Sequence, residues 1–152
     1  MSDRVELSEI IEHLKNKRII SSVKVVSVDD SIQRSICRLR CNLLPSRFKL
    51  DIRLIQTEIE IIYSYQLFHK RPILRWDNAP HFPDIATFPH HCHNQKGEIG
   101  KSNLIGNVLA DIDLVLKEIK KFLIRQFILP RVLAKQKRQN GLTPVSSAGA
   151  TG

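Results

Sequence analysis

Apolar and polar side chains alternate with a period of two from residue 37 to residue 67, and this pattern constrains the fold most strongly. The apolar residues occupy odd positions in 37–43, even positions in 48–54 and odd positions again in 59–67. Since successive side chains of a strand point to opposite faces of a sheet, the pattern is typical of strands with one buried face. The change of parity predicts a tight turn or bulge at Gln56-Thr57, and we favour a hairpin.

Segments on either side of this region complete the expected fold. Residues 19–28 are rich in Ile and Val and predict a strand, and Ile73–Trp76 predicts another short strand. Leu7, Ile10, Ile11 and Leu14 recur at helical spacing. This spacing predicts a short helix over residues 8–17, with Ser8 as its N-cap.

Helical spacing returns at Leu104 and predicts a long helix, capped by Ser102 or Asn103 and limited by Pro130. A second helical piece is expected over about 131–139. The sequence therefore predicts an α+β fold, with an N-terminal helix, an antiparallel sheet of four to six strands, a His-rich loop and a long C-terminal helix. We expect one domain over residues 1–130, a basic helical arm over 131–141 and a disordered or non-native tail over 142–152.

Positive charge is concentrated near the C-terminus. The chain carries a net charge of +9, and residues 117–138 hold eight basic residues against Glu118 alone, which places +7 of the total there. A one-sided basic segment is typical of proteins that bind a polyanion, such as RNA, or an acidic partner protein. Its candidate RNA-binding residues are Arg131, Lys135, Lys137 and Arg138.

Cysteine usage and hydropathy predict a cytoplasmic protein. The chain has three cysteines and an N-terminus without the apolar region of a secretory signal. No apolar run approaches the length of a membrane span, so we expect no membrane association.

Four of the six histidines fall in the proline-rich segment 77–97, at positions 81, 90, 91 and 93. Imidazole titrates near neutrality, so a cluster can supply both a general base and a general acid. Metal-free RNA cleavage needs a base for the 2′-hydroxyl, an acid for the leaving oxygen and a cation near the phosphate. We therefore consider His81, His90, His91 and His93 as acid–base residues, with Asp77 orienting a ring and Arg75 contacting phosphate.

Two other interpretations of the cluster stay open. His91-x-His93 in an extended segment places both rings on one face, so His91 and His93 are alternative ligands for a divalent metal, with His81, or else Asp77 or Cys92, as the third ligand. The histidines can also serve only as structural hydrogen-bond donors. The acid–base interpretation needs no cofactor, whereas the ligand interpretation needs a divalent metal.

Three blocks in order, Tyr63-Ser-Tyr, Arg75-Trp-Asp-Asn-Ala-Pro-His and Phe88-Pro-His-His-Cys-His, resemble the TumE-type toxin family of prokaryotic toxin–antitoxin loci. The resemblance covers about residues 8–120, and Cys92 stands where the family usually has Lys. It implies a small α+β toxin, encoded beside a DNA-binding antitoxin that neutralises it by direct binding. Tyr65 and Asn78 match the family pattern and are further candidates for substrate binding.

The sequence thus predicts the toxin of a toxin–antitoxin pair, a ribonuclease that uses the histidines. The alternatives are a binding module that grips RNA or an antitoxin without cleaving, and a metal-dependent hydrolase. The oligomeric state stays open.

Overall fold

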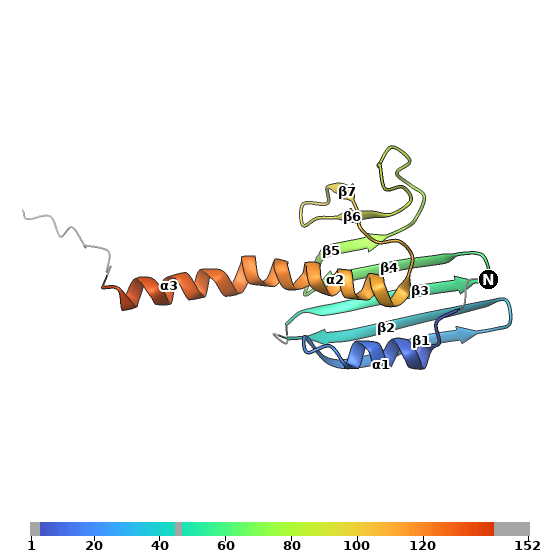
Figure 1. Cartoon of the computed structure of the whole chain (residues 1–152), viewed down its shortest axis with the longest axis horizontal. Helices are drawn as coiled ribbons and strands as arrows, with labels where there is room; N and C mark the ends of the chain where they lie inside the picture. Colours follow the sequence, from blue (N-terminus) through green and yellow to red (C-terminus); the bar gives the residue numbers. More distant parts are fainter. Residues whose placement is uncertain (1–3, 45–46, 142–152) are drawn as a thin grey trace, which may run out of the picture. The chain divides into compact units, whose positions relative to one another are not determined.

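A computed structural model describes residues 4–44 and 47–141 of the chain, and Figure 1 shows its order of elements. The elements are α1 (Leu7–Lys15), β1 (Ile20–Asp30), β2 (Arg34–Leu43), β3 (Lys49–Thr57), β4 (Ile61–Phe68), β5 (Pro72–Asp77), β6 (His91–His93), β7 (Ile99–Lys101), α2 (Val108–Leu123), a π-helical segment (Ile124–Ile128) and α3 (Leu129–Gln139). The predicted α+β class is confirmed.

All strands belong to one antiparallel sheet in which each strand pairs with its neighbours in the sequence, from β1 to β7. The expected hairpin is confirmed, but the predicted place of its turn was wrong, because Gln56 and Thr57 are the last residues of β3. The turn lies at 58–60, where the Thr57 hydroxyl accepts the Glu60 backbone N–H at 3.1 Å. The predicted strand count was wrong, because the sheet has seven strands and not four to six. The difference arises in segment 77–97 and just after it, where β6 and β7 form a pair of three-residue strands at the edge of the sheet (Figure 1).

In the unit that ends at Leu116, the core lies between one face of the sheet, α1 and the first part of α2. Buried side chains alternate along β2, β3 and β4, at odd, even and odd positions respectively, as the sequence pattern predicts. Ile10 and Leu14 of α1 and Ile112 of α2 are fully buried. Asp113 of α2 contacts α1 and the residues just after it, since its Oδ1 lies 2.8 Å from His13 Nε2 and 2.7 Å from Lys17 Nζ. The opposite face of the sheet, which we call the open face, carries mainly polar and charged side chains beside an apolar row of Ile36, Ile55 and Ile62.

The helix starts differ from the predicted ones. The N-cap of α1 is Glu6, and Ser8 lies inside the helix. At α2 the cap is Asn107 and not Ser102 or Asn103, because the Asn107 side-chain oxygen accepts the Ala110 N–H at 3.1 Å. Asp111 accepts the backbone N–H groups of Ile105 and Gly106 at 3.0 and 2.8 Å, which holds residues 104–107 outside the helix.

Replacing Asn107 with Ala is therefore expected to lower the free energy of unfolding by about 1 kcal/mol, because one backbone donor of the first turn loses its partner. Urea denaturation of wild type and variant measures this difference. Asn103→Ala is the matched control, since Asn103 is exposed and precedes the helix. Equal losses in both variants would contradict the assignment of the cap.

The C-terminal helical region departs from a plain α-helix. Pro130 lacks a backbone N–H, and the chain passes from α2 through the π-helical turn into α3 without leaving helical geometry. The chain divides into two compact units, one that ends at Leu116 and one that begins at Lys117, inside α2. The proposed tail, 142–152, lies outside the described residues. Within residues 4–44 and 47–141, no helix has the length and hydropathy needed to cross a membrane.

Candidate functional site

Asp77, the last residue of β5, is the centre of the site. Its carboxylate is buried, with 4% of the residue exposed, and is surrounded by cationic or titratable groups. Oδ2 accepts a hydrogen bond from Arg75 Nε at 2.7 Å, and Oδ1 lies 3.0 Å from His91 Nε2. The Ala79 backbone N–H also binds Oδ1, at 3.0 Å, so the carboxylate is held from several sides. Asp77 is therefore placed where the predicted orienting role would involve more than one ring.

His91 is oriented by the main chain. Its Nδ1 lies 2.9 Å from the carbonyl oxygen of Pro89, which can only accept, so this nitrogen carries the hydrogen. The other ring nitrogen, Nε2, faces Asp77. The ring is only 2% exposed, which makes His91 a positioning group more readily than a group that contacts substrate.

His93 is the accessible member of the pair. Its side chain is 29% exposed, its Nε2 lies 3.7 Å from Asp77 Oδ2, and its ring centroid lies 5.1 Å from that of His91. Burial lowers the pKa of His93 below its ordinary value of 6.5, and the negative charge of Asp77 offsets only part of this effect. His93 is thus held mainly neutral at pH 7, as a general base requires.

A cavity of about 420 Å³ brings these groups together with His81. Arg75, Asp77, His91 and His93 form part of its wall, and the exposed His81 lies on the same cavity. Phe82 lies close to all three rings, with centroids 4.9 Å from His91, 6.0 Å from His93 and 6.3 Å from His81. Sequence reasoning missed Phe82, because an aromatic residue in a proline-rich loop has no periodic pattern that would reveal its contacts.

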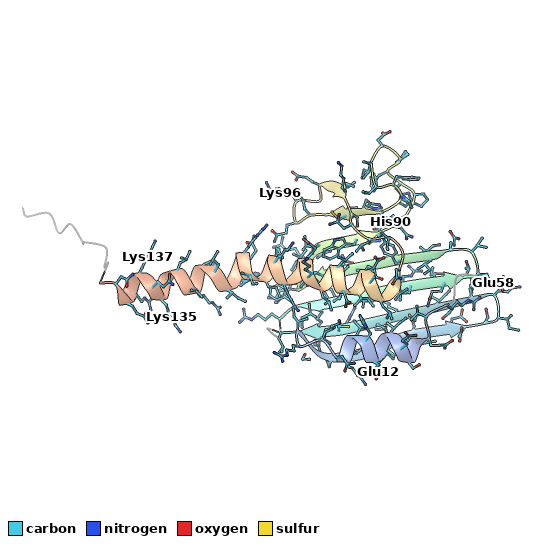
Figure 2. The ribbon with its side chains drawn as sticks, in the orientation of Figure 1. Glu12, Glu58, His90, Lys96, Lys135 and Lys137 are labelled. Carbon is cyan, nitrogen blue, oxygen red and sulfur yellow. The ribbon has the colours of Figure 1, made fainter. Side chains whose placement is uncertain are left out.

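His90 is separated from the other histidines. Its Nδ1 lies 2.7 Å from the hydroxyl of Tyr63, a buried residue of β4, and the two rings are stacked with centroids 5.8 Å apart. In Figure 2, His90 is labelled beside the start of β6. The structure therefore brings three of the four predicted histidines to one cavity and gives the fourth a contact with the sheet core.

Tyr65 and Asn78 have structural environments. Tyr65 is 1% exposed in the core, and burial raises the pKa of its phenol well above the usual value. The Asn78 amide accepts the Tyr63 N–H at 2.9 Å and donates to the Ile61 carbonyl at 2.7 Å, so it ties the loop to β4. Their positions do not support the predicted contact with substrate.

Strand register aligns the site with basic residues on the open face. Arg38 of β2 pairs with Arg53 of β3, Arg53 with Ser64 of β4, Ser64 with Asp77, and Asp77 with His91. We call this cross-strand set the Arg53 row. Sequence reasoning did not single out Arg53. Once the hairpin at 58–60 is accepted, counting back from it places Arg53 opposite Ser64.

Asp77, His91 and His93 could also hold a metal ion, since their ligand atoms lie within 4.8 Å of one another. The Pro89 contact would direct the free nitrogen of His91 toward such an ion. The positive charge of Arg75, bonded to Asp77, opposes a cation at this place. His81 is not part of the group, so among the third ligands considered from the sequence the structure favours Asp77 over His81.

The family model described as "Toxin TumE" matches residues 9–123 of this chain. The chain belongs to the TumE toxin family. Comparisons with curated proteins and with solved structures gave no match. The resemblance seen in the three sequence blocks is thereby confirmed, over nearly the same residues.

The TumE match contains every residue of the cavity and of the Arg53 row, and it ends at the last residue of α2. The basic arm lies beyond it. Arg131, Lys135, Lys137 and Arg138 are all exposed on α3, and Figure 2 labels Lys135 and Lys137 on this helix. Helical spacing places Leu129, Val132 and Leu133 on the other side of α3, each 45–48% exposed. The arm is thus amphipathic as well as basic.

Proposed function

We propose that this TumE-family chain is the toxin of a toxin–antitoxin pair and cleaves RNA by metal-free acid–base chemistry. The observation that carries the proposal is the buried carboxylate of Asp77, which faces His91, His93 and Arg75 in one cavity. The family supports a toxin and an antitoxin partner. The residues of the cavity support the chemistry.

In the proposed reaction, neutral His93 removes the proton of a ribose 2′-hydroxyl, and the 2′-oxygen attacks the adjacent phosphorus. The guanidinium of Arg75, with 44% of the side chain exposed, stabilises the charge that develops on the phosphoryl oxygens. A protonated His81 gives its proton to the departing 5′-oxygen. The products are a 2′,3′-cyclic phosphate and a 5′-hydroxyl end. Asp77 and His91 act through His93. They position its ring, and the carboxylate of Asp77 stabilises the positive charge that His93 gains when it takes the proton.

A metal-dependent hydrolase is the second candidate function, because the three ligand atoms of Asp77, His91 and His93 are close enough for one ion. In that case the ion, and not His93, would activate the nucleophile. A binding module that grips RNA or antitoxin without cleaving is the third.

Incubating the purified chain with single-stranded RNA, with and without EDTA, tests the proposal. We expect cleavage that survives EDTA and leaves 2′,3′-cyclic phosphate ends. Cleavage that EDTA abolishes and Mn²⁺ or Zn²⁺ restores would support the hydrolase. Retention of intact RNA by the folded protein in both conditions would support the binding module. The proposed antitoxin would be supported if a neighbouring gene encodes a helix-turn-helix protein and if that protein co-purifies with this chain.

The basic arm provides a separate prediction. If Arg131, Lys135, Lys137 and Arg138 contact phosphates, replacing all four with Gln should reduce the salt slope of RNA binding by about 3, at roughly 0.7 per contact. Binding to labelled RNA over a range of KCl concentrations measures the slope. An unchanged slope would assign these charges to a protein partner, for which the apolar residues of α3 are also suited.

A further inference from the structure

We propose that the open face of the sheet is a path for single-stranded RNA that leads across the strands into the histidine cavity. This inference rests on the proposed function and names the substrate and its route. It depends on strand register, on a hollow in the open face and on unpaired positive charge.

Register places the path. The Arg53 row crosses five strands, from β2 to β6, and ends at Asp77 and His91. A second row beside it runs from Lys24 through Arg40, Asp51 and Gln66 to Arg75 and His93. Because residues paired across neighbouring strands lie on the same face, both rows are on the open face. With strands ~4.8 Å apart, Arg53 lies ~10 Å and Arg38 ~14 Å from Asp77.

The open face is hollow along the Arg53 row. A depression of about 470 Å³ is lined by Arg38, Arg53, Ser64 and Gln66, and it reaches Arg75. Gln66 and Arg75 also line the histidine cavity, so the two hollows share a boundary. A chain lying in the depression therefore passes directly to the groups that we assign to catalysis.

The charge of the depression is positive. Arg38 and Arg40 both bond Asp51, at 2.9 and 2.7 Å, so the three groups together keep one positive charge. Burial of Asp51 opposes ionisation, but the hydrogen bonds from Arg40 and Arg38 lower its pKa below the usual value, and it stays ionised at neutral pH. Within the described part of the chain, Arg53 has no acidic partner. Its guanidinium is thus available to a phosphate group.

Single-stranded RNA fits this path better than a duplex. Asp77 and His91 lie at the bottom of a cavity, with 5% and 2% of their side chains exposed. A nucleotide of a duplex would have to leave its stack to bring its 2′-hydroxyl to His93, whereas a single strand enters without this cost. The depression has arginines for the backbone and few apolar groups for base stacking, which predicts little sequence preference at these positions.

The test compares Arg53→Gln with wild type, using a short, fully 2′-O-methylated single-stranded oligonucleotide that cannot be cleaved at the 2′-position. We expect Arg53→Gln to raise Kd about 3- to 10-fold and to reduce the salt slope by about 0.7. With cleavable RNA, KM should rise by a similar factor and kcat should change much less. Arg18→Gln is the matched control, because Arg18 is exposed between α1 and β1, outside both rows.

Two results would overturn the path. One is an Arg53→Gln variant with the Kd and salt slope of wild type, and the other is a duplex of the same sequence that binds as tightly with the same dependence on Arg53. Because the binding probe is not cleaved, this test is independent of catalysis. Loss of binding in Arg53→Gln by a protein that cleaves no RNA would keep the path and reject the nuclease. If the wild-type protein cleaves RNA and Arg53→Gln binds the probe normally, the path is rejected and the nuclease is kept.

Discussion

Replacing Asp77 with Asn is expected to reduce the rate of RNA cleavage by about 10²- to 10⁴-fold. The amide keeps the size of the side chain but removes the negative charge that lies 3.0 Å from His91 and 3.7 Å from His93. It also replaces an oxygen with a donor, which opposes either the Arg75 N–H or the Ala79 N–H. The geometry of both rings should loosen, and the fall should appear in kcat under conditions of saturating RNA.

Asp84→Asn is the matched control for this experiment, because Asp84 is an exposed residue of the same loop. Circular dichroism and a thermal melt establish that the Asp77 variant is folded. If Asp77→Asn does not fold, Asp77→Glu keeps the charge, moves it by one methylene and should give a folded protein with reduced kcat. A folded Asp77→Asn protein with wild-type activity would remove Asp77, and with it the proposed site, from catalysis.

The second large effect is expected from a comparison of His93 and His90, two histidines of the same segment with different contacts. His93→Asn should lower kcat by about 10²- to 10⁴-fold, because it removes the proposed base. His90→Asn should leave most of the activity and instead lower the free energy of unfolding by about 1 kcal/mol, through the lost contact with Tyr63. Single-turnover cleavage and urea denaturation of both variants measure the two effects. Strong loss of kcat in His90→Asn, with His93→Asn active, would reverse our assignment.

The pH profile provides an independent check on His93. A base acts in its neutral form, and burial lowers the pKa of His93 below 6.5. The acid limb of kcat/KM should therefore have its midpoint below pH 6.5, since activity is lost only when pH falls through the lowered pKa. The same shift makes the folded state lose stability as pH falls from 6.5 through the lowered pKa, because the unfolded chain binds the proton more readily in this range. An acid limb above pH 6.5 would assign the titration to another group.

Much of the sheet could be predicted from alternation alone. Leu39, Ile52 and Tyr65 pair across β2, β3 and β4 on the buried face, as a period of two predicts for each strand. Arg53 follows Ile52 in the chain, so the same period places it on the open face. The strands β6 and β7 were missed because each has three residues, too few for a period, and because prolines precede β6. Pairing with β5 stabilises β6, and such pairing is not visible in a local pattern.

The candidate site was predicted in composition but not in arrangement. The rule that His91-x-His93 places both rings on one face proved correct once β6 formed, and the same rule directs His90 elsewhere. The link from Asp77 to both rings, and from the rings to Arg53, depends on which residues of different strands are opposite one another. Register of this kind arises from the turns and the core together, so no single segment of the sequence contains it.

The alignment of the Arg53 row has a consequence for how chain length can vary in this family. Inserting or deleting one residue inside β3 or β4 would move every later side chain of that strand to the other face and would separate Arg53 from Ser64 and Asp77. An added residue in the turn at 58–60 changes no pairing. We expect TumE-family chains to differ in length at this turn and at the tip between β6 and β7, while the strands that carry the two rows keep their lengths.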